Sequence, residues 1–150
     1  MANVKVVISD STISEVDNTQ TKDYLYQDIT SNLLLNSNKT DIICNHDINA
    51  IFGSLKNIFT YTPGERPMLP PFGLDLRGLL YEPMNEHTAN SIGMAVYNAI
   101  IAWEPRITIN NINVTADYDD NTYYVSVVFT CPRIGVEEPQ QFTYQLRKTV

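Results

Sequence analysis

The sequence predicts an α+β fold in which helices pack on a small three-stranded antiparallel sheet at the C-terminal end of the chain. Apolar residues recur at three- and four-residue steps, the spacing of helices, between residues 47 and 103. From residue 107 onward they alternate with polar residues, the spacing of strands. The 150 residues can bury a core without disulfides or metal. We expect residues 1–23 to be an N-terminal arm or linker and residues 24–150 to form one domain.

The segment before the first helix has few structural signals. Residues 5–8 have the composition of a short strand, whereas residues 9–22 are polar and lack the apolar area that would offset ordering entropy. Residues 24–35 contain two short apolar runs and are expected to be extended, and residues 36–40 are typical of a turn.

The first firm helix is predicted to begin at Asp47, a favourable N-cap residue, and to end at the sequence Thr-Pro-Gly of residues 62–64. Residues 63–73 contain four prolines, which exclude a helix interior or a central strand. We expect a stiff surface loop there, followed by a short helix over residues 74–81.

A second long helix is predicted to start at Thr88, as its N-cap, and to end before Pro105. Met94, Tyr97 and Ile101 extend its apolar surface almost around the whole circumference. Such a helix is usually buried or covered by a partner.

Three strands are predicted to follow in an antiparallel meander. The alternation of residues 107–118 slips at Asn110 and Asn111, which indicates a β-bulge. Residues 119–121 are a turn, the second strand runs to Cys131, and residues 132–139 are expected to form a longer loop.

The third strand is the last one and is therefore expected to lie at an edge of the sheet, with unpaired backbone groups. A guarded edge is one interpretation, because Arg147 and Lys148 are typical edge charges. Addition of a partner's strand is the other. The residues concerned are Phe142, Thr143, Tyr144, Gln145 and Leu146.

Composition excludes several classes of partner. Seventeen acidic against ten basic residues give a net charge of −7, which argues against nucleic acid. No apolar run is long enough for a transmembrane helix, so no membrane partner is expected. Two cysteines, Cys44 and Cys131, are no disulfide framework and are typical of a reducing compartment.

Catalytic signals are weak. Glu65, Glu82 and Glu104 are candidate carboxylates for a glycosidase, which needs one acid and one base or nucleophile. Arg66 and Arg106 stand near two of them, and a neighbouring cation lowers the pKa that a general acid needs raised. We therefore expect no enzyme, and keep a muralytic glycosidase as the alternative.

Metal and cofactor signals are weaker still. Cys44, His46, His87 and Cys131 have no spacing typical of zinc sites, and the glycines are too scattered for a phosphate loop. No cofactor, metal site or catalytic residue is expected.

The corner formed by Glu104, Pro105 and Arg106 has two interpretations. It is either a helix stop with an internal salt bridge, or a recognition corner at which Arg106 binds a carboxylate of a partner.

An ordered set of motifs resembles the phage baseplate wedge family of tail sheath initiators, whose relatives include a type VI secretion baseplate subunit. The motifs are Asp-Ile-Asn-Ala-Ile at residues 47–51, Gly-Glu-Arg-Pro at Gly64, Glu65, Arg66 and Pro67, Phe-Gly at 72–73, Glu-Pro at 82–83, and Glu-Pro-Arg at 104–106. The resemblance runs from about residue 28 to the C-terminus.

The resemblance implies a cofactor-free structural protein of the virion, in six copies in the baseplate of a contractile tail and assembled in the host cytoplasm. Its implied partners are other wedge proteins, the tail sheath subunit and the tail tube. Glu104, Pro105 and Arg106 would dock on the helical core bundle of the wedge, and the last strand would exchange with the first sheath ring. The family also carries an old lysozyme-like label, which is the source of the alternative.

Overall fold

A computed structural model describes residues 24–35 and 41–147. The predicted arm of residues 1–23, with its strand at 5–8, and the turn at 36–40 lie outside the described residues. The elements in chain order are β1 (Gln27–Ile29), β2 (Cys44–His46), α1 (Asp47–Thr60), α2 (Arg77–Tyr81), α3 (Glu86–Trp103), β3 (Thr108–Asp117), β4 (Thr122–Cys131), a 3-10 turn (Pro132–Ile134) and β5 (Val136–Arg147).

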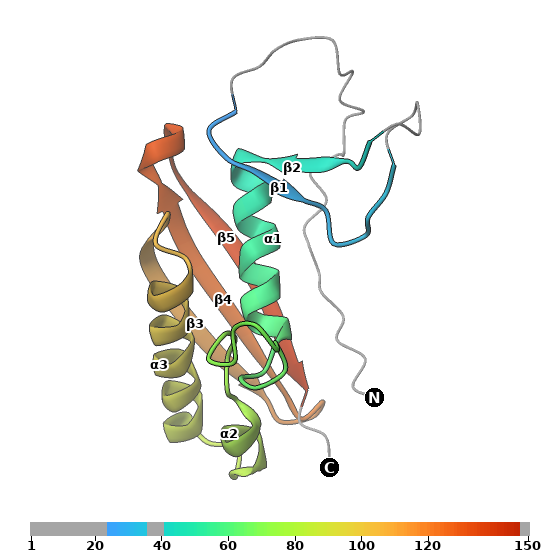
Figure 1. The fold of residues 1–150 in the computed structure, drawn as a ribbon. Helices are drawn as coiled ribbons and strands as arrows, with labels where there is room; N and C mark the ends of the chain where they lie inside the picture. Colours follow the sequence, from blue (N-terminus) through green and yellow to red (C-terminus); the bar gives the residue numbers. More distant parts are fainter. Residues whose placement is uncertain (1–23, 36–40, 148–150) are drawn as a thin grey trace.

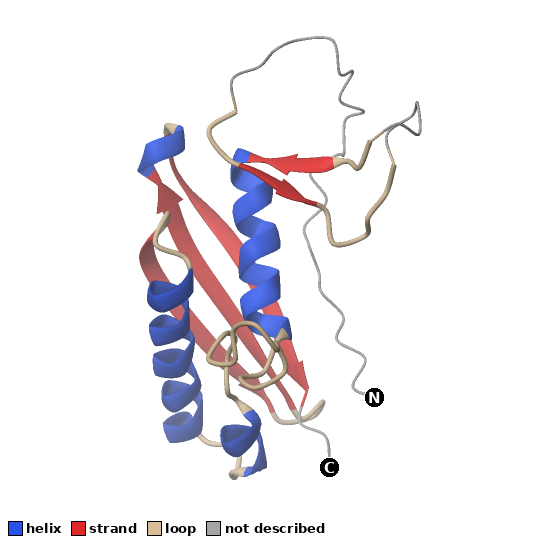
Figure 2. Cartoon of the chain, in the orientation of Figure 1, coloured by secondary structure: helices blue, strands red, loops and turns tan. Residues whose placement is uncertain are grey.

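The predicted α+β fold is confirmed. The C-terminal strands form an antiparallel meander in the order β3-β4-β5. Helices α1 and α3 lie side by side across one face of this sheet (Figures 1 and 2). The inward side chains of the central strand are fully buried, as their alternation predicted: Tyr123, Val125, Val127, Phe129 and Cys131.

The predicted bulge in the first strand is confirmed by a register shift between Ile109 and Asn111. The predicted loop over residues 132–139 is wrong. A 3-10 turn closed by Gly135 is followed at once by β5, which contains Pro139. A proline is tolerated there because, among the described strands, β5 has no neighbour on its outer side, and because the register shifts between Phe129 and Cys131.

Helix α1 packs its apolar stripe on β4 and β5. Phe59 lies 4.8 Å from the ring of Tyr144 and 5.3 Å from that of Phe142, between ring centroids. The Tyr144 hydroxyl donates to the backbone carbonyl of Phe59 at 3.3 Å. These contacts join the first helix to the last strand and close the core.

Asp47 is not the N-cap of α1, which is His46. Asp47 has a positive φ of 47°, and its Oδ1 accepts hydrogen bonds from the backbone N–H groups of Leu25 (3.0 Å) and Tyr26 (3.1 Å). The carboxylate therefore anchors the incoming chain instead of capping its own helix.

Thr88 is likewise not the N-cap of α3. Asn85 takes that position and accepts from the backbone N–H of Thr88 at 2.7 Å. Thr88 is buried, and its hydroxyl donates to the carbonyl of Pro83 at 2.9 Å. A buried threonine in the first turn thus ties the helix to the preceding loop.

The segment that contains β1 is extended, as expected, and β1 pairs with β2 in a two-stranded hairpin. The pairs are Gln27 with His46, Asp28 with Asn45 and Ile29 with Cys44. The hairpin lies at the start of α1 and projects away from the three-stranded sheet (Figure 1).

The proline-rich segment between α1 and α2 is a surface loop, as predicted. The short helix that follows starts at Arg77 instead of residue 74, because Leu74 and Leu76 are used as buried anchors. Within the described residues, no helix is both long and apolar enough to cross a bilayer.

Candidate functional site: a closed corner, an apolar helix face and an open strand edge

The corner after α3 is closed by an ion pair between Glu104 and Arg106. Two parallel hydrogen bonds of 2.5 Å run from the guanidinium Nε and Nη2 to the two carboxylate oxygens. Glu104 is 1% exposed, whereas 25% of Arg106 is exposed. Pro105 lies exposed between them. The internal salt bridge, one of the two interpretations of this motif, is therefore present.

The surroundings keep both groups charged. Burial alone would raise the pKa of Glu104, but hydrogen bonds from Arg106 and Ser54, together with the Arg106 charge, lower it overall. The hydrogen bond to Glu104 raises the pKa of Arg106. An ionised, buried and paired carboxylate is a poor general acid, so this residue does not suit the glycosidase chemistry considered for it.

The corner also contacts the N-terminal hairpin. The guanidinium carbon of Arg106 lies 5.0 Å from the ring centroid of Tyr26, and the nearby charge of Asp28 favours the cation. Sequence reasoning missed Tyr26, because no local pattern relates a residue in an extended segment to a distant helix end. The corner thus joins α3, β3 and the hairpin.

One face of α3 carries large apolar side chains that the described chain leaves uncovered. Met94 is 70% exposed, Tyr97 48% and Ile101 54%. These three residues, here called the α3 stripe, lie on the side of the helix opposite Ile92, Val96 and Ile100, which are buried. One face of this helix is thus buried, and coverage of the other face by a partner stays a prediction.

Strand β5 lies at one edge of the described sheet, with β4 as its single neighbour. Phe142, Tyr144 and Leu146 are buried against the helices, whereas Thr143 and Gln145 lie on the opposite face and are partly exposed. The buried side chains of β5 therefore fix its register in the sheet and hold its outer edge in place.

Short-range contacts close the surface loop that contains Gly64, Glu65, Arg66 and Pro67. The N–H of Gly64 donates to the carbonyl of Pro70 at 2.7 Å, and Glu65 Oε2 accepts from the N–H of Thr62 at 2.9 Å. The Arg66 guanidinium lies 4.8 Å from the ring centroid of Phe72. These contacts suit the structural role expected for the loop.

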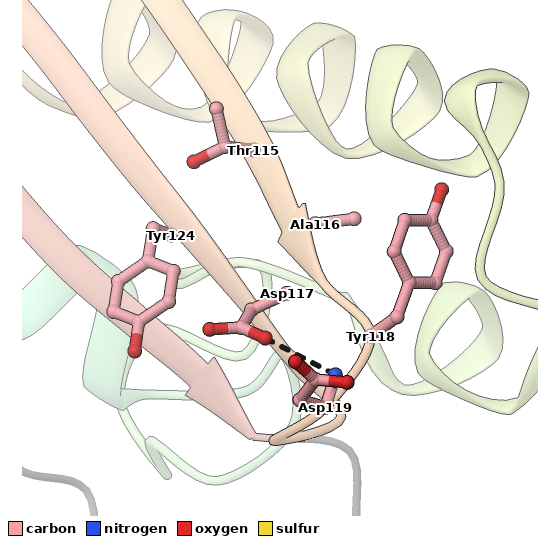
Figure 3. Close-up of a pocket in the computed structure, with 6 residues that line it drawn as sticks. All are labelled: Thr115, Ala116, Asp117, Tyr118, Asp119 and Tyr124. Carbon is pink, nitrogen blue, oxygen red and sulfur yellow. Dashed lines mark hydrogen bonds between the residues drawn. The ribbon is translucent and has the colours of Figure 1, made fainter.

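A shallow pocket lies at the turn between β3 and β4, lined by Thr115, Ala116, Asp117, Tyr118, Asp119 and Tyr124 (Figure 3). Asp117 Oδ1 accepts from the backbone N–H of Asp119 at 3.1 Å, so the carboxylate shapes the turn. Among the described residues, no group of three or more His, Cys, Asp or Glu side chains could hold a metal ion.

The family and its relatives follow from comparison with known proteins. The family model for "Baseplate wedge protein gp25" matches residues 45–132. The baseplate wedge protein gp25 of Enterobacteria phage T4 is 36% identical over 106 residues, which cover 71% of this chain and 80% of that protein. Baseplate protein W of Escherichia phage P2 is 27% identical over 85 residues, 57% of this chain and 74% of that protein.

Solved structures share the fold at low identity. A "putative tail lysozyme" from Geobacter sulfurreducens has a TM-score of 0.61 at 22% identity, covering 67% of this chain and 90% of that one. A chain of the anti-feeding prophage baseplate has a TM-score of 0.58 at 15% identity, covering 83% and 87%.

The relatives that establish the family are structural baseplate proteins, in agreement with the expectation that this chain is not an enzyme. The motifs quoted from residues 47–106 lie within the segment matched by the family model. The chain belongs to the baseplate wedge protein gp25 family and is a structural component of the virion, in the baseplate of a phage tail.

Proposed function

We propose that this protein docks on other wedge proteins through α3 and its C-terminal corner, and that it initiates the tail sheath by strand addition at β5. The observation that carries the proposal is that β5 has a free edge in the described sheet, one face of which packs on helices. Main-chain hydrogen bonds along such an edge supply affinity with little demand on the side chains of the added strand.

Docking would use the α3 stripe together with the exposed part of the corner. Ile101 stands one helical turn before Pro105, so the stripe leads into the corner. Large apolar side chains at steps of three and four residues are the pattern by which one helix packs on another. A helical partner from the wedge core bundle fits this face.

Within the corner, the three motif residues would have different roles. Glu104 is too buried to meet a partner and would position Arg106. Pro105 and the exposed quarter of Arg106 remain available for contact. The corner would therefore form a rigid end of the docking face. Arg106 would contact a partner with its exposed part while its ion pair with Glu104 stays intact.

The docking test adds charge to the stripe. Met94→Lys/Ile101→Lys should lose co-purification with the wedge proteins while keeping its melting temperature, since both side chains are exposed. Met68→Lys/Tyr81→Lys adds the same charge to two exposed apolar side chains outside α3 and is the matched control. Equal binding by the stripe variant and wild type would rule out this face.

The sheath test uses charges on the two edges of one sheet. Thr143 and Asn113 pair with Ser126 from opposite sides, and Gln145 and Thr115 pair with Tyr124 in the same way. Lysine on an edge strand discourages addition of another strand.

Thr143→Lys/Gln145→Lys on β5 should therefore allow wedge assembly but abolish sheath growth from the baseplate, scored by electron microscopy of assembled tails. Asn113→Lys/Thr115→Lys on β3 adds the same charge to the same face and should leave sheath growth intact. Full-length sheath on the β5 variant, or loss of sheath with the β3 variant alone, would overturn strand addition at β5.

A further inference from the structure

The N-terminal hairpin has a firm base and an uncovered apolar surface. Its base is held by Asp47, which accepts two backbone N–H groups, and by the ring of Tyr24 stacked 3.7 Å from that of His46. Beyond the base, six large aliphatic side chains are each between 41% and 63% exposed. They are Leu25, Ile29, Leu33, Leu34, Leu35 and Ile43, here called the hairpin patch.

The hairpin also forms a sheet too small to be stable by itself. β1 and β2 form a sheet of two strands, extended by a bridge between Leu35 and Ile42. A two-stranded hairpin is marginally stable in water, and a third strand or a covering element is needed for independent stability. Within the described residues the hairpin patch is uncovered, so its side chains are available to another segment.

The chain itself contains a suitable segment. Residues 4–8 read Val-Lys-Val-Val-Ile, four β-branched apolar residues and one base. Val4, Val6 and Ile8 share one face of a strand, since side chains alternate. The charged residues of the described hairpin are Asp28, Asp41 and Asp47, so the single charge of the segment, on Lys5, is complementary.

The segment can reach the hairpin. Residues 9–23 connect it to Tyr24 and could span up to about 50 Å when extended. A connection of this length gives an effective concentration in the millimolar range when its sites are within reach. The segment lies well before residue 45, where the match to the family model begins, so this contact would be an addition to the region that the family model covers.

We propose that residues 4–8 bind as a third strand along β1 of the same molecule and cover the hairpin patch. Sequential strands commonly pair, and β1 is the first strand that the structure describes after the segment. The bound segment would place apolar side chains against Leu25 and Ile29 and bring Lys5 near the acids of the hairpin. The proposal does not depend on docking or on sheath initiation.

Hydrogen exchange on the full chain tests the proposal. Val6→Asp/Ile8→Asp removes the apolar face of the segment, and Ser11→Asp/Thr12→Asp adds the same charge to the connection as the matched control. In wild type and control, amides of residues 27–35 and 42–46 should exchange at least about tenfold more slowly than in the segment variant. Melting temperatures of the three proteins should stay close, because the main core is untouched.

Equal exchange in all three proteins would overturn the proposal. A dilution series distinguishes the occupant, since contact within one molecule is independent of protein concentration. Protection that falls on dilution would assign the segment to a second copy and overturn the contact within one chain. As a reciprocal check, Ile29→Lys on the hairpin should release the segment and raise exchange to the same extent as Val6→Asp/Ile8→Asp.

Discussion

The guanidinium of Arg106 and the carboxylate of Glu104 form a bidentate pair in which the acid is buried and the base reaches the surface. The pair therefore links the stability of the fold to the face that we propose for docking. Any substitution at Arg106 changes both, and the two effects need separate measurements.

Arg106→Ala should destabilise the isolated protein by about 3–5 kcal/mol, because it leaves an uncompensated buried charge on Glu104. Urea denaturation gives the free energy of unfolding. Arg133→Ala, which removes an exposed arginine from the turn before β5, should change it by less than about 0.5 kcal/mol.

The double variant Glu104→Met/Arg106→Met should recover much of the loss, because apolar residues often replace a buried ion pair at little cost. If Arg106→Ala proved as stable as wild type, the pair would contribute nothing to the fold.

Stability in acid should depend on Glu104. Its pKa is lower in the folded protein than in the unfolded chain, so its contribution is fully present above the unfolded value, about 4.3, and is lost as the pH falls through the folded value. Glu104→Gln should therefore lose less stability than wild type between neutral pH and about pH 3. Thermal melts across this range measure the difference, and parallel curves for the two proteins would contradict the assignment.

The parts of the fold that depend on local patterns were predictable. Residue-by-residue alternation located β4 and the inward side of β5, and the slip at Asn110 and Asn111 located the bulge in β3. The period of a strand is a local property, so these predictions required no knowledge of the tertiary structure.

The sequence-based predictions were wrong where the role of a side chain depends on a partner in another segment of the chain. Asp47 and Thr88 are good capping residues by type, but each uses its side chain on another segment, on Leu25 and Tyr26 or on Pro83. The ion pair of Arg106 with Glu104 was one of the two interpretations of that motif, because the two residues are close in sequence. The contact of Arg106 with Tyr26 could not be predicted, because no sequence pattern relates the two residues. The open edge of β5 followed from strand order; whether a sheath subunit uses it remains a prediction.

Asp47→Ala should loosen the hairpin. It removes the acceptor of two backbone N–H groups, one exposed and one partly buried, and a hydrogen bond of this kind contributes about 0.5–1.5 kcal/mol to stability. Faster hydrogen exchange at residues 25–29 would report the change. Asp47→Asn keeps an acceptor oxygen and tolerates the positive φ, so it should preserve most of the protection. Equal loss in both variants would point to the charge of Asp47 instead of its acceptor.

Two glycines of the surface loop provide a matched pair for the last prediction. Both have positive φ, 94° at Gly64 and 113° at Gly73. A Cβ at Gly73 would lie 2.2 Å from the carbonyl oxygen of Tyr61, whereas a Cβ at Gly64 meets no atom within 4 Å. Both alanine variants share backbone strain, and the steric clash belongs to Gly73→Ala alone.

Gly64→Ala should cost about 1–3 kcal/mol from backbone strain. Gly73→Ala should cost clearly more, because the backbone of Tyr61 cannot move without disturbing its hydrogen bond to the N–H of Leu74, 3.0 Å long, next to the buried Phe72. Urea denaturation of both variants gives the difference directly. Equal destabilisation of the two variants would mean that the backbone at Tyr61 can move to make room for the added methyl group. The packing of the loop on the end of α1 would then be looser than the close approach at Gly73 indicates.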